Sequence, residues 1–286
     1  MLSLILFSAL FAAQIPEPAA PLDYVCPMDP EVRAASPGIC SRCGMKLRPG
    51  VADHLENALD VKLQPRAARA GSAAELIFKI AEPATGKPVH DFEIVHEKLF
   101  HLFIVSEDLS FFLHEHPRLT EDYSFRFKTC FPKPGMYRLL CDFYPKEGTP
   151  QLLQRTLLIP DSSGKFSGFD AASLAPDLAE KQASNLTVEV STQPERPIAG
   201  MKTLMFFHLK PAEGLEPYLG VWAHMLAVSD DLIDVMHSHP FLADGRPQIQ
   251  FNMIFPRART YKVWVQFQRQ GIVNTVAFNV PVSVLR

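Results

Sequence analysis

Three of the five cysteines lie close together near the start of the chain, where they could hold a metal ion. Cys40 and Cys43 form a C-x-x-C pair, and thirteen residues separate Cys26 from Cys40. Such a pair places two thiolates on one tight turn, and Gly44 directly after it suits the backbone of that turn. Prolines between Cys26 and Cys40 favour a folded-back loop. We therefore expect the three thiolates to converge on one ion.

The ion would also supply the folding energy of this segment, because about 25 residues cannot build a hydrophobic core. Met28 and Met45 would add thioether donors and favour Cu(I) or Ag(I). Asp29 would instead complete a site for Zn(II). Two alternatives stay open: a zinc knuckle that only folds the segment, and a disulfide between Cys40 and Cys43.

Six of the ten histidines form a second pattern, H-x12-H-x-H-P, which occurs twice. The first triad is His101, His114 and His116; the second triad is His224, His237 and His239. A hairpin turn in the first pattern would place His101 opposite His116, and Phe103 opposite His114. Residues two apart share a strand face, so the three imidazoles would meet on one ion, Cu(II) or Zn(II). A shift of register by one residue would break the set. The alternative is a structural role at the strand ends.

Four histidines and two cysteines fall outside these patterns. His90 and His96 could extend the first site, but we expect solvated loop residues because the second pattern has no equivalents. Cys130 and Cys141 have apolar equivalents in the second half of the chain, which predicts buried thiols. If they lie on paired strands of one hairpin, they are too far apart for a disulfide.

An internal repeat provides the elements that position these residues. Residues 57–160 and 184–286 align with each other, and a linker rich in Ser, Gly, Asp and Ala joins them at 161–183. Segments such as 137–143 alternate as strands do, and no helical periodicity is sustained. We therefore expect an all-β fold with two tandem immunoglobulin-like or cupredoxin-like β-sandwiches after a metal-knuckle module at 22–50.

The first twenty residues indicate the compartment. Residues 1–13 are uncharged and apolar, like the central part of a secretory signal, and are too short to span a bilayer as a mature helix. We expect a leader over 1–20 and an exported bacterial protein, periplasmic or secreted, that is not transmembrane after processing. A disordered apolar tail is the alternative. The net charge of −3 excludes the basic surplus of a nucleic-acid binder, and the 47% hydrophobic content excludes a disordered chain.

Residues 24–49, YVCPMDPEVRAASPGICSRCGMKLRP, resemble the small heavy-metal-binding domain. That family has a tyrosine, a variable residue, CPMHPE, a proline-glycine turn and C-P-x-C-G-M. It is attached to membrane-fusion subunits of copper and silver efflux pumps and to copper-transporting P-type ATPases. The resemblance therefore implies heavy-metal binding and a metal-efflux or envelope protein as partner. Asp29 replaces the family's histidine, which leaves the fourth ligand open.

The repeated domain resembles a domain of secreted bacterial proteins of unknown function that also carry this metal module. Together the patterns predict an exported metal-binding protein for copper or another soft metal, acting in metal homeostasis or resistance. The first alternative is an interaction protein, a rigid adaptor with a structural zinc. The second is a redox enzyme of tandem cupredoxin-like domains. Neither half has the cysteine and histidine spacing of a blue-copper site, so we expect no enzymatic activity.

Overall fold

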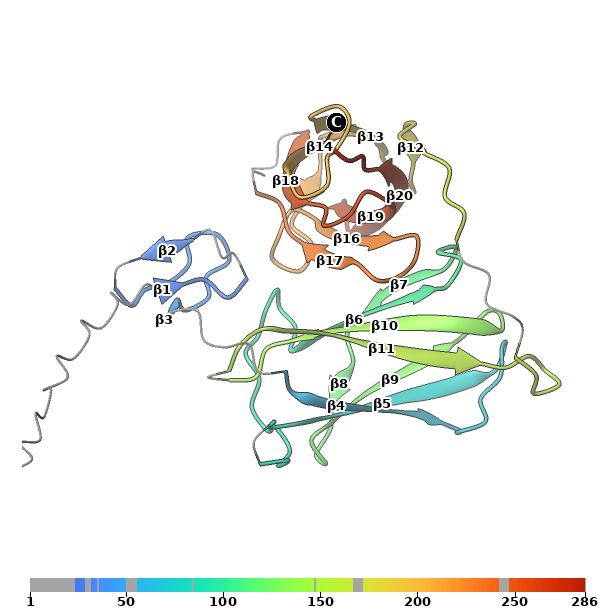
Figure 1. The fold of residues 1–286 in the computed structure, drawn as a ribbon. Helices are drawn as coiled ribbons and strands as arrows, with labels where there is room; N and C mark the ends of the chain where they lie inside the picture. Colours follow the sequence, from blue (N-terminus) through green and yellow to red (C-terminus); the bar gives the residue numbers. More distant parts are fainter. Residues whose placement is uncertain are drawn as a thin grey trace, which may run out of the picture. The chain divides into compact units, whose positions relative to one another are not determined.

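The structure is a computed structural model in which every described element is a β-strand, and this confirms the expected all-β fold (Figure 1). The chain divides into two compact units, Met1–Asp53 and His54–Arg286. No helix in the described part of the chain is long and apolar enough to cross a membrane. The expected leader lies outside the described residues, which are 24–28, 32–34, 36–49, 56–83, 85–146, 148–166, 172–241 and 247–285.

The first unit is a small three-stranded module. Its antiparallel sheet has the order β2-β1-β3, with β1 at Tyr24–Val25, β2 at Arg33–Ala34 and β3 at Arg48–Pro49. The buried residues are Cys26, Cys40 and Leu47. Two of these three are cysteines, so among the described residues of the module the fully buried core is centred on thiols, as expected for a segment folded around a metal.

The first half of the second unit is a β-sandwich of two four-stranded antiparallel sheets, ordered β4-β5-β9-β8 and β11-β10-β6-β7. This is the A-B-E-D and G-F-C-C′ arrangement of the immunoglobulin-type sandwich. The strands are β4 (Ala58–Gln64), β5 (Ala73–Ala81), β6 (Phe100–Ser106), β7 (Phe112–Glu115), β8 (Arg118–Leu119), β9 (Ser124–Cys130), β10 (Gly135–Phe143) and β11 (Gln151–Ile159).

The second half repeats this sandwich. One sheet has the order β12-β13-β14-β18, and the other has the order β15-β19-β16-β17 with β20 also paired to β19. The strands are β12 (Lys181–Gln182), β13 (Thr187–Gln193), β14 (Lys202–Lys210), β15 (Leu215–Glu216), β16 (His224–Ser229), β17 (Val235–Ser238), β18 (Gln248–Ile254), β19 (Thr260–Arg269) and β20 (Ile272–Pro281). Strand β12 therefore lies inside the segment expected to be a linker.

A tyrosine near the start of β10, and its equivalent in β19, support the immunoglobulin-like alternative over the cupredoxin-like one. The hydroxyl of Tyr137 donates to the carbonyl of Lys133 at 2.8 Å. In the second sandwich the backbone N–H of Arg257 donates to the hydroxyl of Tyr261 at 3.2 Å. A buried tyrosine bonded to the backbone a few residues upstream is the tyrosine corner of this fold.

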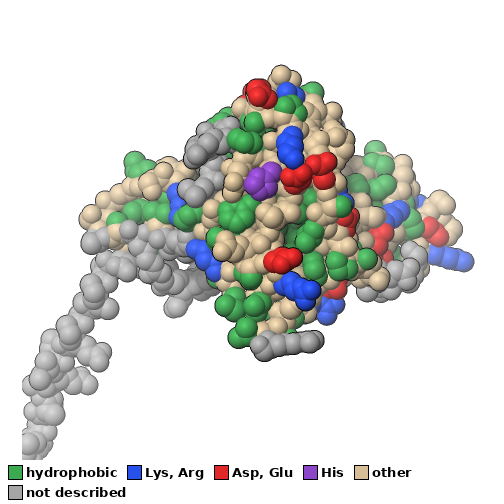
Figure 2. Space-filling model, turned by 90° about the horizontal axis from the view of Figure 1, so that it is seen from above, with side chains coloured by type: hydrophobic (Ala, Val, Ile, Leu, Met, Phe, Trp, Pro, Cys, Tyr) green, Lys and Arg blue, Asp and Glu red, His purple; other side chains and the backbone are tan. Residues whose placement is uncertain are grey.

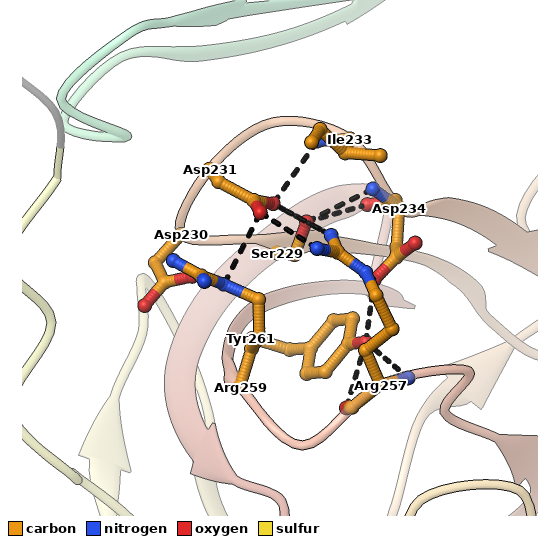
Figure 3. Close-up of polar contacts among 8 residues, drawn as sticks. All are labelled: Ser229, Asp230, Asp231, Ile233, Asp234, Arg257, Arg259 and Tyr261. Carbon is orange, nitrogen blue, oxygen red and sulfur yellow. Dashed lines mark hydrogen bonds and ion pairs between the residues drawn. The ribbon is translucent and has the colours of Figure 1, made fainter.

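A polar network holds the hairpin turn between β16 and β17 in place (Figure 3). Arg257 donates to the carboxylates of Asp231 and Asp234, each at 2.8 Å. The hydroxyl of Ser229 donates to Asp231 at 2.6 Å, and that of Tyr261 donates to Asp234 at 2.8 Å. The turn is thus joined to the loop between β18 and β19, which fixes the register of the hairpin that carries the second triad.

The two sandwiches share a buried apolar interface formed by the outer faces of β6 and β16. In β6, Leu102 and Ile104 belong to the core of the first sandwich. The alternate residues Phe103 and Val105 belong instead to a third cluster that combines both sandwiches. The interface cluster comprises Phe103, Val105, Leu109 and Leu140 of the first sandwich and Leu226, Val228, Leu232 and Trp264 of the second. Both central strands are therefore buried on both faces.

The expectation for Cys130 was wrong. Cys141 is buried, but Cys130 is exposed at the end of β9. The two strands do not form a hairpin, because β9 and β10 belong to opposite sheets and the chain crosses between the sheets at Lys133. The turn residues between them are compatible with both arrangements, so the sequence did not distinguish a hairpin from a crossover.

Candidate metal centres

The three clustered cysteines converge as expected. Their sulfur atoms all lie within 4.8 Å of one another, and Cys26 Sγ is 3.5 Å from Cys43 Sγ. Sulfurs bound to one tetrahedral ion at about 2.3 Å would be roughly 3.8 Å apart, so the spacing fits a shared ion. Gly44 has a φ of 75° and donates its N–H to the carbonyl of Cys40 at 3.0 Å, which closes the knuckle.

Two thiols of the module, those of Cys40 and Cys43, have raised pKa values that favour their neutral form. The pKa of Cys43 is raised, chiefly by its contact with Cys26 and then by burial. Burial also raises the pKa of Cys40. A cation would reverse this, because a metal ion deprotonates a coordinating thiol outright. The cluster is therefore arranged for a cation rather than for an exposed reactive thiolate.

The remaining candidate ligands of the module differ in position. Met28 packs against the cysteine cluster as a partly buried side chain. Met45 is also partly buried, and its carbonyl accepts the N–H of Cys40 at 2.7 Å. Asp29 lies outside the described residues. Met28 is thus the fourth donor best supported by the packing, and a thioether beside three thiolates suits a soft ion.

The predicted register of the first histidine hairpin is confirmed. Phe103 pairs with His114 in the ladder between β6 and β7, so His101 lies opposite His116 just beyond it. The ring nitrogens of the first triad converge: His101 Nδ1 is 3.2 Å from His114 Nε2 and 3.2 Å from His116 Nε2. Three nitrogens at about 2.0–2.1 Å from one ion would be roughly 3.3–3.6 Å apart.

Hydrogen bonds fix which nitrogens of the first triad are free of protons. His101 Nε2 donates to the carbonyl of Val95 at 3.0 Å, and His114 Nδ1 donates to Gln266 Oε1 at 2.6 Å. In neutral rings the opposite nitrogens then carry lone pairs, and these are the atoms that face each other. Burial lowers the pKa of His101 to about 4 and that of His116 to about 3, so the rings are neutral at pH 7. The lone pairs of His101 Nδ1 and His114 Nε2 therefore converge, together with His116, on a point that suits a cation.

The second triad repeats this geometry, as its own register predicts. Leu226 pairs with His237 in the ladder between β16 and β17, and the three ring nitrogens again lie within 4.8 Å of one another. His224 Nε2 donates to the carbonyl of Tyr218 at 3.0 Å, as His101 does to Val95. His224 Nδ1, His237 Nε2 and His239 Nε2 are buried without a hydrogen-bond partner. Buried polar atoms of this kind require an explanation, and an ion provides one.

The expectation for His96 was wrong, whereas His90 is exposed as expected and stacks on Tyr123. His96 is partly buried, and its ring centroid lies 3.8 Å from that of His239. Its Nε2 is also buried without a partner. His96 has a φ of 47°, in a tight turn whose equivalent in the second sandwich begins at Leu219. The sequence showed that the residue is not repeated, and this made it resemble an ordinary loop residue.

The sequence did not reveal that the two triads lie against each other. His114 and His224 have ring centroids 5.5 Å apart, and His101 and His237 have centroids 5.9 Å apart. Distances within a triad are similar, for example 5.4 Å between His101 and His114. The available signal was the unbroken apolar runs LFIV at 102–105 and MLAV at 225–228, because a strand with apolar residues on both faces must be covered on both faces. On the face drawn in Figure 2, histidine occupies only a small area, as expected for mostly buried rings.

Two further residues at the centre were missed. Asp142 Oδ2 accepts the Nδ1–H of His237 at 2.6 Å, and Gln266 accepts that of His114. Each is a polar residue in a mostly buried strand, within YRLLCDF and YKVWVQF, and the two positions align in the repeat. Carboxylate or amide acceptors on the second ring nitrogen are usual partners of metal-binding histidines.

Fold and sites together define a protein of two immunoglobulin-like sandwiches with a cysteine module and two histidine triads, all of which have metal-ligand geometry. The chain belongs to the family described as Domain of unknown function (DUF8832), which matches residues 53–157 and 171–284. Residues 24–49 match the Heavy metal binding domain. This confirms both resemblances inferred from the sequence. No curated protein matches the chain.

Several solved structures are distantly similar. Adhesin InvE of Yersinia pseudotuberculosis is 9% identical, with a TM-score of 0.26 over 79% of this chain and 60% of that one. The Escherichia coli adhesin FdeC is 13% identical, with a TM-score of 0.27 over 83% and 70%. A putative membrane anchored protein of Corynebacterium diphtheriae is 11% identical, with a TM-score of 0.25 over 86% and 63%. At such TM-scores these likenesses carry no conclusion about this chain.

Proposed function

We propose that this chain is an exported metal-binding protein that captures a soft ion, Cu(I) above all, in metal homeostasis or resistance. The observation that carries the proposal is the convergence of Cys26, Cys40 and Cys43 inside a matched heavy metal binding domain. Three sulfurs with Met28 packed beside them form a soft donor set, which supports Cu(I) as the ion. The histidine triads are further sites for copper or zinc.

The proposed location and partner rest on the sequence. The apolar run at residues 1–13 supports export to the periplasm or beyond the cell. The module's resemblance to domains on copper and silver efflux systems supports a metal-efflux or envelope protein as partner. The role we propose is binding and delivery rather than catalysis, since Val265 stands where the first sandwich has Cys141 and neither triad has a thiolate ligand.

A Cu(I) competition titration under anaerobic conditions tests the proposal. The full mature chain is compared with a variant carrying Cys26→Ser, Cys40→Ser and Cys43→Ser. We expect the wild type to hold one Cu(I) with thiolate-to-copper absorption in the ultraviolet, and the triple variant to lose both. Cys130→Ser, which removes an exposed cysteine outside the module, is the matched control and should change neither. Unchanged Cu(I) binding in the triple variant would reject the proposal.

A structural adaptor is the second candidate, and the apolar interface cluster between the sandwiches favours it. Eight buried residues, four from each sandwich, form one apolar cluster that joins the two domains. In that case the module would hold zinc for folding alone. Chelator exchange distinguishes the two functions. A delivery protein releases its ion to a competing chelator while it stays folded, whereas a structural zinc leaves only as the module unfolds.

A further inference from the structure

We propose that the two histidine triads form one dinuclear metal centre, in which each sandwich binds one ion and orients a ligand of the other. The proposal rests on the metal-binding function above, but it concerns only imidazole ligands and requires no cysteine. It also differs from two independent sites in two respects that can be measured: the two ions must interact, and binding of each ion must depend on both sandwiches.

The first argument is distance across the interface. Ring centroids of opposite triads are separated by 5.5 Å for His114 and His224, and by 6.0 Å for His101 and His224. His114 and His237, which hold equivalent positions in the two hairpins, are 6.3 Å apart. These rings are first neighbours of one another, so ions bound to the two triads would lie next to each other in one buried cluster.

The second argument is the exchange of orienting groups. Asp142 of the first sandwich fixes the ring of His237 in the second triad, and Gln266 of the second sandwich fixes the ring of His114 in the first. Asp142 pairs with His101 in its ladder, just as Gln266 pairs with His224 in the other. The exchange is therefore reciprocal and follows the internal repeat. The middle histidine of each triad, His114 or His237, would lack its hydrogen-bond acceptor in a single isolated sandwich.

The third argument is the state of the ligand nitrogens. Backbone carbonyls accept from Nε2 of His101 and His224, which leaves Nδ1 of each ring as the ligand nitrogen. Asp142 and Gln266 accept from Nδ1 of the middle histidines, which leaves Nε2 as the ligand nitrogen. Each acceptor fixes the tautomer and orientation of its ring before an ion binds, as the outer partners of metal-binding histidines do. The three ligand nitrogens of the second triad are all buried without a hydrogen-bond partner: His224 Nδ1, His237 Nε2 and His239 Nε2.

His96 makes the two ions inequivalent. It comes from the loop before β6, and its ring lies 3.8 Å from that of His239 and 5.6 Å from that of His224. Its Nε2 is buried and unpaired, although it is not one of the three converging nitrogens of the second triad. A rotation of the His96 ring would bring it to the second ion as a fourth nitrogen. The first ion would then have three imidazoles and an open coordination position, and the second ion would have four. Nitrogen-only sets suit copper and zinc, and of these copper binds the more tightly.

Electron paramagnetic resonance with Cu(II) as the probe tests the coupling. The protein is the full chain with Cys26→Ser, Cys40→Ser and Cys43→Ser, so that copper binds only to histidine. We expect two Cu(II) per chain and a spin-coupled spectrum, seen as lost intensity or a half-field transition. Two magnetically isolated signals, or no bound copper, would overturn the proposal. Failure of the cysteine module in the wild type would reject the proposed function and leave this result standing.

The exchanged orienting groups give the second test, by titration of the same chain. Asp142→Ala should weaken binding of the ion at the second triad by about 10–100-fold, although Asp142 belongs to the first sandwich. Asp142→Asn, which can still accept the hydrogen bond from His237, should recover most of the affinity. Asp60→Ala, at an exposed carboxylate, and His90→Ala are the controls and should change nothing. Unchanged affinity in a folded Asp142→Ala protein would contradict the proposal.

Discussion

Trp264→Ala tests whether the interface between the sandwiches holds the histidine centre together. Trp264 is 5% exposed, and its ring stacks on Phe112 of the other sandwich with centroids 5.0 Å apart. It belongs to the interface cluster and not to the core of its own sandwich. Removal of a buried tryptophan costs about 3–5 kcal/mol. Here that loss falls mainly on the contact between the domains.

For a unit of this size, a loss of about 3–5 kcal/mol corresponds to a fall in melting temperature of roughly 6–20 °C. Opening of the interface separates each middle histidine from its acceptor in the other sandwich. We therefore expect copper binding at both triads to weaken at least about tenfold, which is about 1.4 kcal/mol. Calorimetry and copper titration of the full chain measure the two effects.

Phe251→Ala is the matched control for this experiment. Phe251 is fully buried in the core of the second sandwich and takes no part in the interface cluster. It should cost a similar amount of stability and leave copper affinity near the wild-type value while the chain stays folded. The reasoning would be refuted if Trp264→Ala bound copper as the wild type does, or if the two variants lost affinity equally.

Three further predictions concern pH, thiol accessibility and the module. Burial lowers the pKa of His101 to about 4 and that of His116 to about 3. Below about pH 6.5 the unfolded metal-free chain therefore binds more protons than the folded one. Its stability should therefore be full above that pH and fall toward pH 4, and a flat melting temperature across this range would contradict the assignment. Cys130 should react with a thiol reagent in the native chain, and Cys141 only after unfolding; mass spectrometry of labelled peptides decides this. Gly44→Ala places a side chain at a φ of 75°, where space is open but the backbone is strained by about 1–2 kcal/mol. Cu(I) affinity of the module should fall about tenfold, and equal affinity would show that the knuckle does not need this conformation.

Much of this molecule could be predicted from the sequence, because its informative patterns are local. The C-x-x-C pair with Gly44 predicts the knuckle, since a tight turn fixes where two thiolates lie. Side chains alternate between the two faces of a strand, and the turn between the strands has one predicted position. These two facts were enough to place His101 opposite His116. Strand alternation and the repeat likewise predict two sandwiches.

The features that the sequence did not predict depend on contacts between distant segments. Nothing in a single hairpin states that its outer face meets the other hairpin, so the pairing of the triads and the role of Asp142 were missed. The location of Cys130 depended on whether two strands pair or cross between sheets, and Pro-Gly turns allow both. His96 stands out only once its loop is seen beside His239.

The most direct test of the central claim is anomalous X-ray scattering at the copper edge from crystals of the copper-loaded chain. The account predicts one copper among Cys26, Cys40 and Cys43, and a close pair of coppers between the two histidine triads. The account would be contradicted if copper were missing from the cysteines, or if the histidines held no pair.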